Sequence, residues 1–291
     1  MTTLTYTTRT PDGPPAYARA LAGSAWLPGR RQIRAEFMKQ ARRRGLMIAA
    51  TVLTVASVIT YFAVEEALHL HNPREYNPAG GTHGLVNADL ILAELGAIVA
   101  VLFGASAGAA DVTAGVFRNL VTTGRSRVAL FLARIPAGLA LSIAFTMAGY
   151  AVAVAASVLL AGSQHAPATR LMPIPPLHFI LAGGGWLIVN SAMAFLLGLG
   201  LSSLTGSQPI TIAVMLALNM VVMPIIASVS ALPALQQLLP GVALYQLQPP
   251  ALAQYSNPAL VMPAAMIAVV LIGWAALAVG AGAWRTATRD A

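Results

Sequence analysis

Six apolar runs, each long enough to cross about 30 Å of hydrocarbon as a helix, constrain this chain more than any other feature. Hydrophobic residues make up 57% of its 291 residues and charged residues 9%, against roughly 25% in an average soluble domain. We predict an all-α membrane protein with six transmembrane helices, at residues 45–63, 88–110, 136–161, 177–201, 210–232 and 259–284. Residues 128–135, just before the third of these helices, are expected outside the membrane as a connecting arm.

Lys and Arg are distributed unevenly among the segments that join these runs. Fifteen of the 17 lie before the first run, in residues 111–134 or after the last run, which leaves only Arg74 and Arg170 for the other side. Since positively charged segments stay in the cytoplasm, we expect both termini and residues 111–134 there, in a bacterial plasma membrane. This topology accounts for the net charge of +8, so no nucleic-acid partner is expected.

The residues before the first run divide into two parts. Residues 1–29 are rich in Thr, Pro, Ala and Gly and are expected to form a flexible cytoplasmic tail. Residues 30–44 place Ile33 and Phe37 on one helical face and basic side chains on the rest, which indicates an amphipathic interfacial helix on anionic lipid headgroups. The alternative is that these arginines only set the topology. Residues 45–291 then form the transmembrane domain.

The segment between the fifth and sixth runs, residues 233–258, has no charge but contains five prolines. The prolines prevent a seventh span, while the Leu and Tyr content is high for a free loop. We predict a re-entrant outer segment, with a loop packed on the protein's own surface as the alternative.

Glu94 lies within the second run, where a charged group is expensive and should face a cavity or a partner. It could line a cavity or accept protons, or it could make a structural hydrogen bond with Asn190, Ser191 or Asn219. Glu94, Asn190 and Asn219 are therefore the candidate cavity-lining residues.

Residues 104–108 match G-x-S-x-G, a serine-nucleophile motif around Ser106. The same letters form a small-residue face for helix packing, which we favour because all five histidines fall on or near the other side of the membrane. The outer histidines, with Glu65, Glu66 and Glu75, could bind a metal, and helical spacing makes Glu65, His69 and His71 the candidates. Such groups are more often solvated, and no metal site is predicted. The sequence has no G-x-x-x-x-G-K-[ST] phosphate loop, so the chain by itself is not expected to be an enzyme.

Residues 111–134 carry the most specific pattern. They resemble the second cytoplasmic stretch of ABC type-2 exporter permeases, the membrane subunits of ATP-binding-cassette exporters, which reads E-x-x-x-G-T-L-R-x-L-L-x-x-P-V-S-R. The register holds without a gap, although Val116, Gly124 and Arg125 depart from it. The matching positions are Asp111, Gly115, Phe117, Arg118, Leu120, Val121, Ser126 and Arg127, and Ala133 and Arg134 take the places of a later A-K pair.

The resemblance implies a mechanism for this segment. In that family it forms a coupling helix that docks on a separate ATPase subunit, so residues 111–127 would contact an ABC ATPase that binds ATP and Mg, and this chain would bind no cofactor. A second permease copy or a related permease, together with membrane lipids, would complete the assembly. The expected ATPase-coupling residues are Asp111, Gly115, Val116, Phe117, Arg118, Leu120, Val121 and Arg127.

The resemblance thus implies an ATP-driven efflux permease, and the apolar spans suit a cargo of lipids, amphipathic drugs or hydrophobic peptides. Two alternatives remain, an ATP-independent secondary transporter and a membrane anchor without transport. The secondary transporter is disfavoured because no internal repeat is visible and Glu94 is expected to be the only buried acid.

Overall fold

The computed structural model describes residues 28–113, 126–163, 174–228, 236–250, 252 and 262–288. These residues form helices and no strands, which confirms the predicted all-α class for the part of the chain that is described. The helices are α2 (Arg30–Ala41), α3 (Arg44–Thr51), η1 (Val52–Ala56), α4 (Ser57–His71), α5 (Gly81–Thr113), α7 (Arg127–Ser163), α8 (Leu177–Thr205), α9 (Gln208–Ala217), η3 (Leu218–Val222), α10 (Met223–Ser228), α12 (Pro240–Gln246) and α13 (Ala264–Thr288).

Within the described residues, five helical segments are long and apolar enough to cross a membrane. They correspond to five of the six predicted runs. The fifth predicted span, at residues 210–232, is the exception: its described residues belong to α9, the π-helical turn η3 and α10, and the apolar helix Gln208–Val222 is shorter than the other five. The five segments are Arg44–His71, Gly81–Ala109, Arg127–Ala161, Leu177–Thr205 and Ala264–Thr288.

Helices α5 and α8 pack closely along their length because glycines remove the side chains at their contact. A Cβ atom at Gly104 would overlap the carbonyl oxygen of Phe195, and one at Gly108 would lie 2.7 Å from the Cβ of Ser202. The Ser202 hydroxyl donates a hydrogen bond of 2.7 Å to the carbonyl oxygen of Ala105 on α5. Small residues allow such close approach of helix backbones, so α5 and α8 form the centre of the bundle.

Helix α7 lies beside this pair and is continuous from Arg127 to Ser163. It contains Pro136 without a break in the helix, so residues 128–135 are the first turns of the same rod and not a separate arm. Phe131 and Phe195 are fully buried at the end of the bundle where α7 begins. Their packing fixes the start of α7 against α5 and α8.

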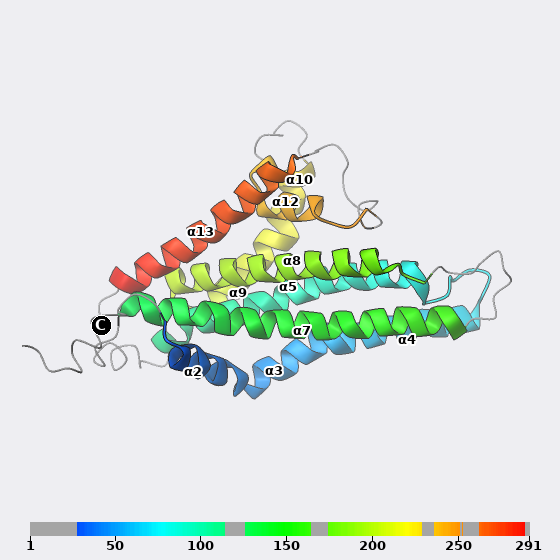
Figure 1. Cartoon of the computed structure of the whole chain (residues 1–291), viewed down its shortest axis with the longest axis horizontal. Coiled ribbons are helices and arrows are strands. Elements are labelled where there is room, and N and C mark those ends of the chain that lie inside the picture. The colour runs from blue at the N-terminus through cyan, green and yellow to red at the C-terminus, as the bar shows by residue number, and fades with distance from the viewer. Residues whose placement is uncertain are drawn as a thin grey trace, which may run out of the picture.

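The remaining helices diverge from this bundle. Figure 1 shows α4, α5, α7 and α8 roughly side by side, whereas α13 crosses them obliquely and α10 and α12 lie beyond its start. Large apolar side chains on α13 remain exposed, including Val269 at 69% and Ile272 at 68%. Exposed side chains of this kind match a lipid environment.

Candidate binding cavity between the helices

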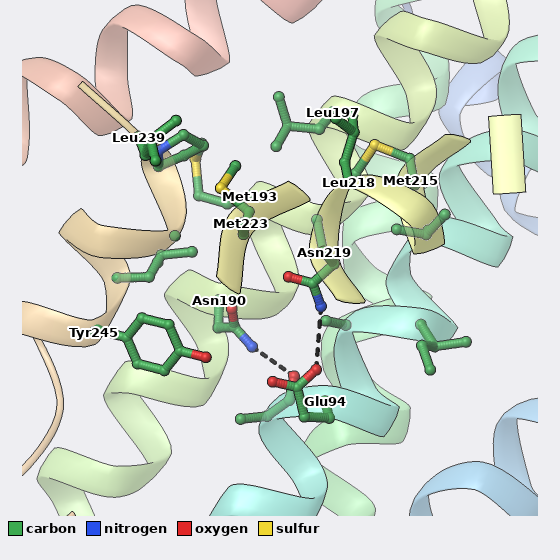
Figure 2. A pocket seen from close by; sticks show the side chains of 18 of the residues that line it. Glu94, Asn190, Met193, Leu197, Met215, Leu218, Asn219, Met223, Leu239 and Tyr245 are labelled. Carbon is green, nitrogen blue, oxygen red and sulfur yellow. Dashed lines mark hydrogen bonds between the residues drawn. The ribbon is translucent and has the colours of Figure 1, made fainter. Parts of the chain in front are cut away.

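A cavity of about 320 Å³ lies where α9, η3, α10, α12 and α13 diverge from α5 and α8. This volume is at the lower end of the roughly 300–1,000 Å³ of small-molecule sites. The wall is mostly apolar and contains three methionines, Met193, Met215 and Met223. Figure 2 shows these side chains around a small polar group formed by Glu94, Asn190 and Asn219.

Glu94 is brought into the cavity by α5, and its side chain is exposed rather than packed. Asn219 Nδ2 donates a hydrogen bond of 3.1 Å to Glu94 Oε2 across the cavity. Asn219 belongs to η3, so a residue 125 positions away completes the polar group. Of the alternatives that the sequence left open, the structure places Glu94 on a cavity wall and also gives it a hydrogen bond.

Asn190 lies beside this pair but bonds elsewhere. Its Nδ2 donates a hydrogen bond of 2.8 Å to the carbonyl oxygen of Ala93, the residue before Glu94. Ser191, the third candidate partner of Glu94, is buried and lies 3.3 Å from the Thr146 hydroxyl on α7. Asn190 therefore joins α8 to α5 at the position of Glu94, and Ser191 joins α8 to α7.

Two tryptophans position the segment that covers the cavity. Trp186 Nε1 on α8 donates to the carbonyl oxygen of Leu244 at 2.9 Å, and Trp274 Nε1 on α13 donates to that of Leu238 at 2.8 Å. Both acceptors lie in residues 236–250, which together with Leu252 are the described part of the predicted re-entrant segment. This segment contains the short helix α12, and its membrane insertion remains a prediction.

Tyr245 on α12 presents its hydroxyl toward the polar group (Figure 2). Burial, and to a smaller extent the nearby Glu94 carboxylate, raises the pKa of the Tyr245 hydroxyl above its ordinary value. The hydroxyl therefore remains a neutral hydrogen-bond donor at physiological pH.

A second acid in the bundle was not recognised from the sequence. Asp89, near the start of α5, is fully buried and neither of its carboxylate oxygens has a hydrogen-bond partner. The absence of a side chain at Gly183 makes room for it, since a Cβ there would lie 2.7 Å from Asp89 Oδ2 and 3.0 Å from the Tyr150 hydroxyl. The expectation that Glu94 is the only buried acid is wrong, because Glu94 faces a cavity while Asp89 is enclosed.

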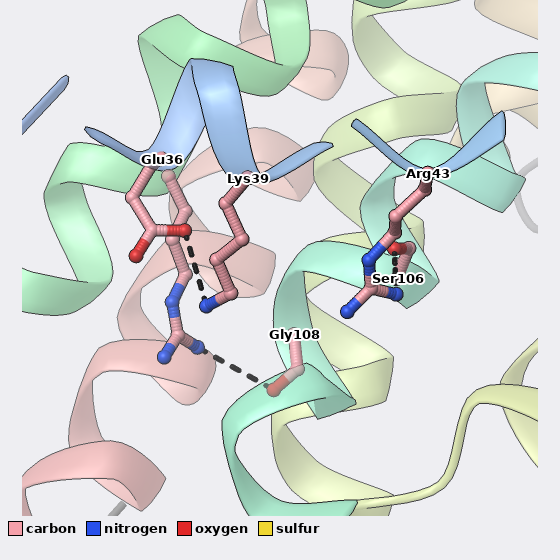
Figure 3. Close-up of polar contacts among 6 residues, drawn as sticks. Glu36, Lys39, Arg43, Ser106 and Gly108 are labelled. Carbon is pink, nitrogen blue, oxygen red and sulfur yellow. Dashed lines mark hydrogen bonds and ion pairs between the residues drawn. The ribbon is translucent and has the colours of Figure 1, made fainter. Parts of the chain in front are cut away.

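Polar contacts also join the chain around α2 to the bundle (Figure 3). Arg43, just after α2, donates a hydrogen bond of 2.7 Å from Nη1 to the Ser106 hydroxyl. Arg134 Nη1 on α7 donates to the carbonyl oxygen of Gly108 at 3.4 Å. Ser106 therefore accepts from an arginine and lies between packing glycines, an environment that supports helix packing over nucleophilic catalysis.

The predicted ATPase-coupling residues are only partly described. Asp111 lies in the last turns of α5. Arg127 begins α7 and donates a hydrogen bond of 3.3 Å to the carbonyl oxygen of Ala287 near the end of α13. The other coupling residues, Gly115, Val116, Phe117, Arg118, Leu120 and Val121, lie outside the described residues.

The candidate metal ligands Glu65, His69 and His71 lie on α4. Within the described part of the chain, no three His, Cys, Asp or Glu side chains gather closely enough to hold a metal ion. His69 Nδ1 lies 2.8 Å from the carbonyl oxygen of Tyr76, which places its N–H donor there and holds the end of α4 against the following turn.

No family model matches this sequence, and a search of the curated proteins finds no match either. The class of the protein therefore follows from the structure. The five helices of membrane-spanning length and composition among the described residues make it a multi-pass helical membrane protein.

Proposed function

We propose that this chain is the permease subunit of an ATP-driven exporter and couples to a separate ATPase through residues 111–127. The observation that carries the proposal is that this segment aligns without a gap with the pattern of ABC type-2 exporter permeases. The segment also lies at a junction between two long helices. The segment joins the end of α5 to the start of α7, and Arg127 at that start bonds to the end of α13. A force applied at this junction would reach three long helices at once.

The neighbouring contacts support this mechanical role. Helix α2 is tied to the same region by the bond from Arg43 to Ser106, and Arg134 bonds within the same part of α5. Most basic side chains of the described residues gather at this end of the bundle, as the positive-inside rule requires of a cytoplasmic face. In the proposed topology both termini are cytoplasmic and α9, η3 and α10 form the fifth of six spans.

The cavity supplies the transport part of the proposal. It lies between the close-packed pair α5 and α8 on one side and α9, η3, α10, α12 and Trp274 of α13 on the other. In the proposed mechanism, ATP-driven closure of two ATPase subunits moves the junction, and the helices around the cavity change their separation. Two permease copies, or this chain and a related one, would pair across the pathway, with residues 233–258 as an outer lid.

The test is assembly with the ATPase. The chain would be co-expressed with ABC ATPase subunits encoded near its gene and purified through a tag on the permease. Replacing Phe117 and Arg118 together with Asp should abolish co-purification, because the apolar and basic contacts of the coupling helix would be lost.

Trp284 and Arg285 provide a matched control. They form another aromatic–arginine pair, on α13 at the same end of the bundle, and Trp284 is 63% exposed. The same double replacement with Asp should leave the ATPase bound. Unchanged assembly of the Phe117 and Arg118 variant, or no complex with any ATPase, would reject the proposal and favour an ATP-independent transporter or an anchor.

A further inference from the structure

The cavity has an apolar wall with a single full charge. Of the described residues that line it, only Glu94 is an Asp, Glu, Lys, Arg or His. Methionine and leucine side chains form much of the rest, together with Trp186, Trp274 and Tyr245. The Glu94 carboxylate is exposed on this wall, where a molecule that enters the cavity can reach it, and a charge that faces apolar side chains is favoured when an opposite charge compensates it.

The residues that the structure describes around the cavity supply no cation to compensate the charge of Glu94. The hydrogen bond to Glu94 comes from the neutral amide of Asn219, and the ion pair found in the described ranges joins Glu36 to Lys39 on α2. Tyr245 is also neutral. The carboxylate is thus oriented by an amide while its charge is left for a molecule that enters the cavity (Figure 2).

We infer that this cavity binds a monovalent organic cation with an apolar body, and that Glu94 is the residue that selects its charge. The ammonium group lies against the Glu94 carboxylate, and the apolar body lies among the methionines. The aromatic residues add cation–π attraction, which is strongest for Trp. Methionine adapts to differently shaped apolar groups, so the site selects charge more strictly than shape.

The inference rests on the proposed function where it identifies the bound cation as the exported cargo, but binding itself needs no ATPase. The probe is benzyltrimethylammonium, and the reference compound is neopentylbenzene, in which carbon replaces the ammonium nitrogen. Both are measured by equilibrium dialysis against the purified full chain in uncharged detergent. The wild-type chain should bind the cation saturably.

The Glu94→Gln variant keeps an oxygen for the Asn219 bond and removes only the charge. It should weaken binding of the cation by about tenfold or more, because a close charge interaction of a few kT is lost, and leave binding of the neutral isostere unchanged. Glu75→Gln is the matched control. Glu75 is exposed and accepts a hydrogen bond of 2.8 Å from Asn72, away from the cavity, so this variant should bind like the wild type.

A second variant retains the carboxylate. Ala97 lines the cavity one turn along α5 from Glu94, so Ala97→Lys places an ammonium group on the same helical face. It should also abolish binding of the cation, because the new lysine ammonium would pair with the Glu94 carboxylate and compete with the probe. Equal affinity of the wild-type and Glu94→Gln chains for benzyltrimethylammonium, or equal losses for both probes, would overturn the inference.

Two further arms separate the possible explanations. Displacement of the probe by dihexanoylphosphatidylcholine but not by dihexanoylphosphatidylglycerol would identify a lipid ammonium headgroup as the cation, and no displacement by either would identify a free amphiphile. Charge-selective binding that depends on Glu94, in a chain that never assembles with an ATPase, would reject the exporter assignment and retain the cation site. Assembly with an ATPase, together with cation binding that does not depend on Glu94, would reject the cation site and retain the exporter assignment.

Discussion

Replacing Gly104 with alanine should force α5 and α8 apart, because the new methyl group has no space at their contact. A Cβ at Gly104 would overlap the Phe195 carbonyl oxygen and lie 2.8 Å from the Leu199 nitrogen, well inside the ordinary contact distance of 3.4 Å. Both obstacles are backbone atoms of α8 and cannot rotate away. The strain must therefore be relieved by moving a whole helix.

The magnitude follows from three contributions. Overpacking of a tight interior typically costs about 1–3 kcal/mol. Separation of the helices also weakens the hydrogen bond from Ser202 to Ala105, and interhelical bonds in membranes average about 0.6 kcal/mol. Alanine recovers up to about 1 kcal/mol of helix propensity over glycine. We expect a net destabilisation of about 1–3 kcal/mol.

The assay is equilibrium unfolding in mixed micelles, followed by far-ultraviolet circular dichroism. Gly185→Ala, on α8, is the control, since nothing lies within 4 Å of a Cβ at that position. It should be neutral or more stable by up to about 1 kcal/mol through helix propensity alone. A Gly104→Ala chain as stable as the wild type, or equal losses in both variants, would refute the packing argument.

Two other predictions concern polar groups in the bundle. Arg43→Gln and Ser106→Ala should each lower the unfolding free energy by about 0.5–1.5 kcal/mol, because each removes the hydrogen bond between these two side chains. Since both replacements remove the same bond, the double variant should lose less than the sum of the two single losses. Strict additivity in this double-mutant cycle would contradict the pairing. Asp89→Asn should unfold at the same or a higher denaturant concentration than the wild type, because asparagine keeps the shape of the buried side chain and cannot ionise. A loss of unfolding free energy above about 1 kcal/mol would contradict this and show a stabilising partner for Asp89.

Hydropathy and charge were sufficient for the class of the protein. An apolar run must satisfy its backbone bonds internally and be long enough for the bilayer, and both properties depend on neighbouring residues in the sequence. This is why five of the predicted runs coincide with long helices. The run at residues 210–232 did not coincide with one long helix, because its continuous apolar helix ends at Val222, two residues before Pro224 in α10, and residues 229–232 lie outside the described part of the chain.

The two acids of α5 show what the sequence could not resolve. Glu94 and Asp89 lie five residues apart in the same helix, and hydropathy treats them alike. Asp89 is enclosed by α7 and α8, through Tyr150 and Gly183, whereas Glu94 faces a cavity whose opposite wall is formed by α9, η3, α10 and α12. Exposure depends on which distant helix covers a given face.

The G-x-S-x-G motif around Ser106 is a second case in which the sequence allowed two roles. The sequence determined that this face is small, and so permitted either an exposed nucleophile or a close helix contact. The tertiary structure decided between them by bringing α8 against Gly104 and Gly108 and the Arg43 side chain against Ser106. Local properties such as helix length, hydropathy and side-chain size are fixed by the order of the residues, whereas the cavity, the partner of Glu94 and the environment of Asp89 and Ser106 arise from contacts between residues far apart in the chain.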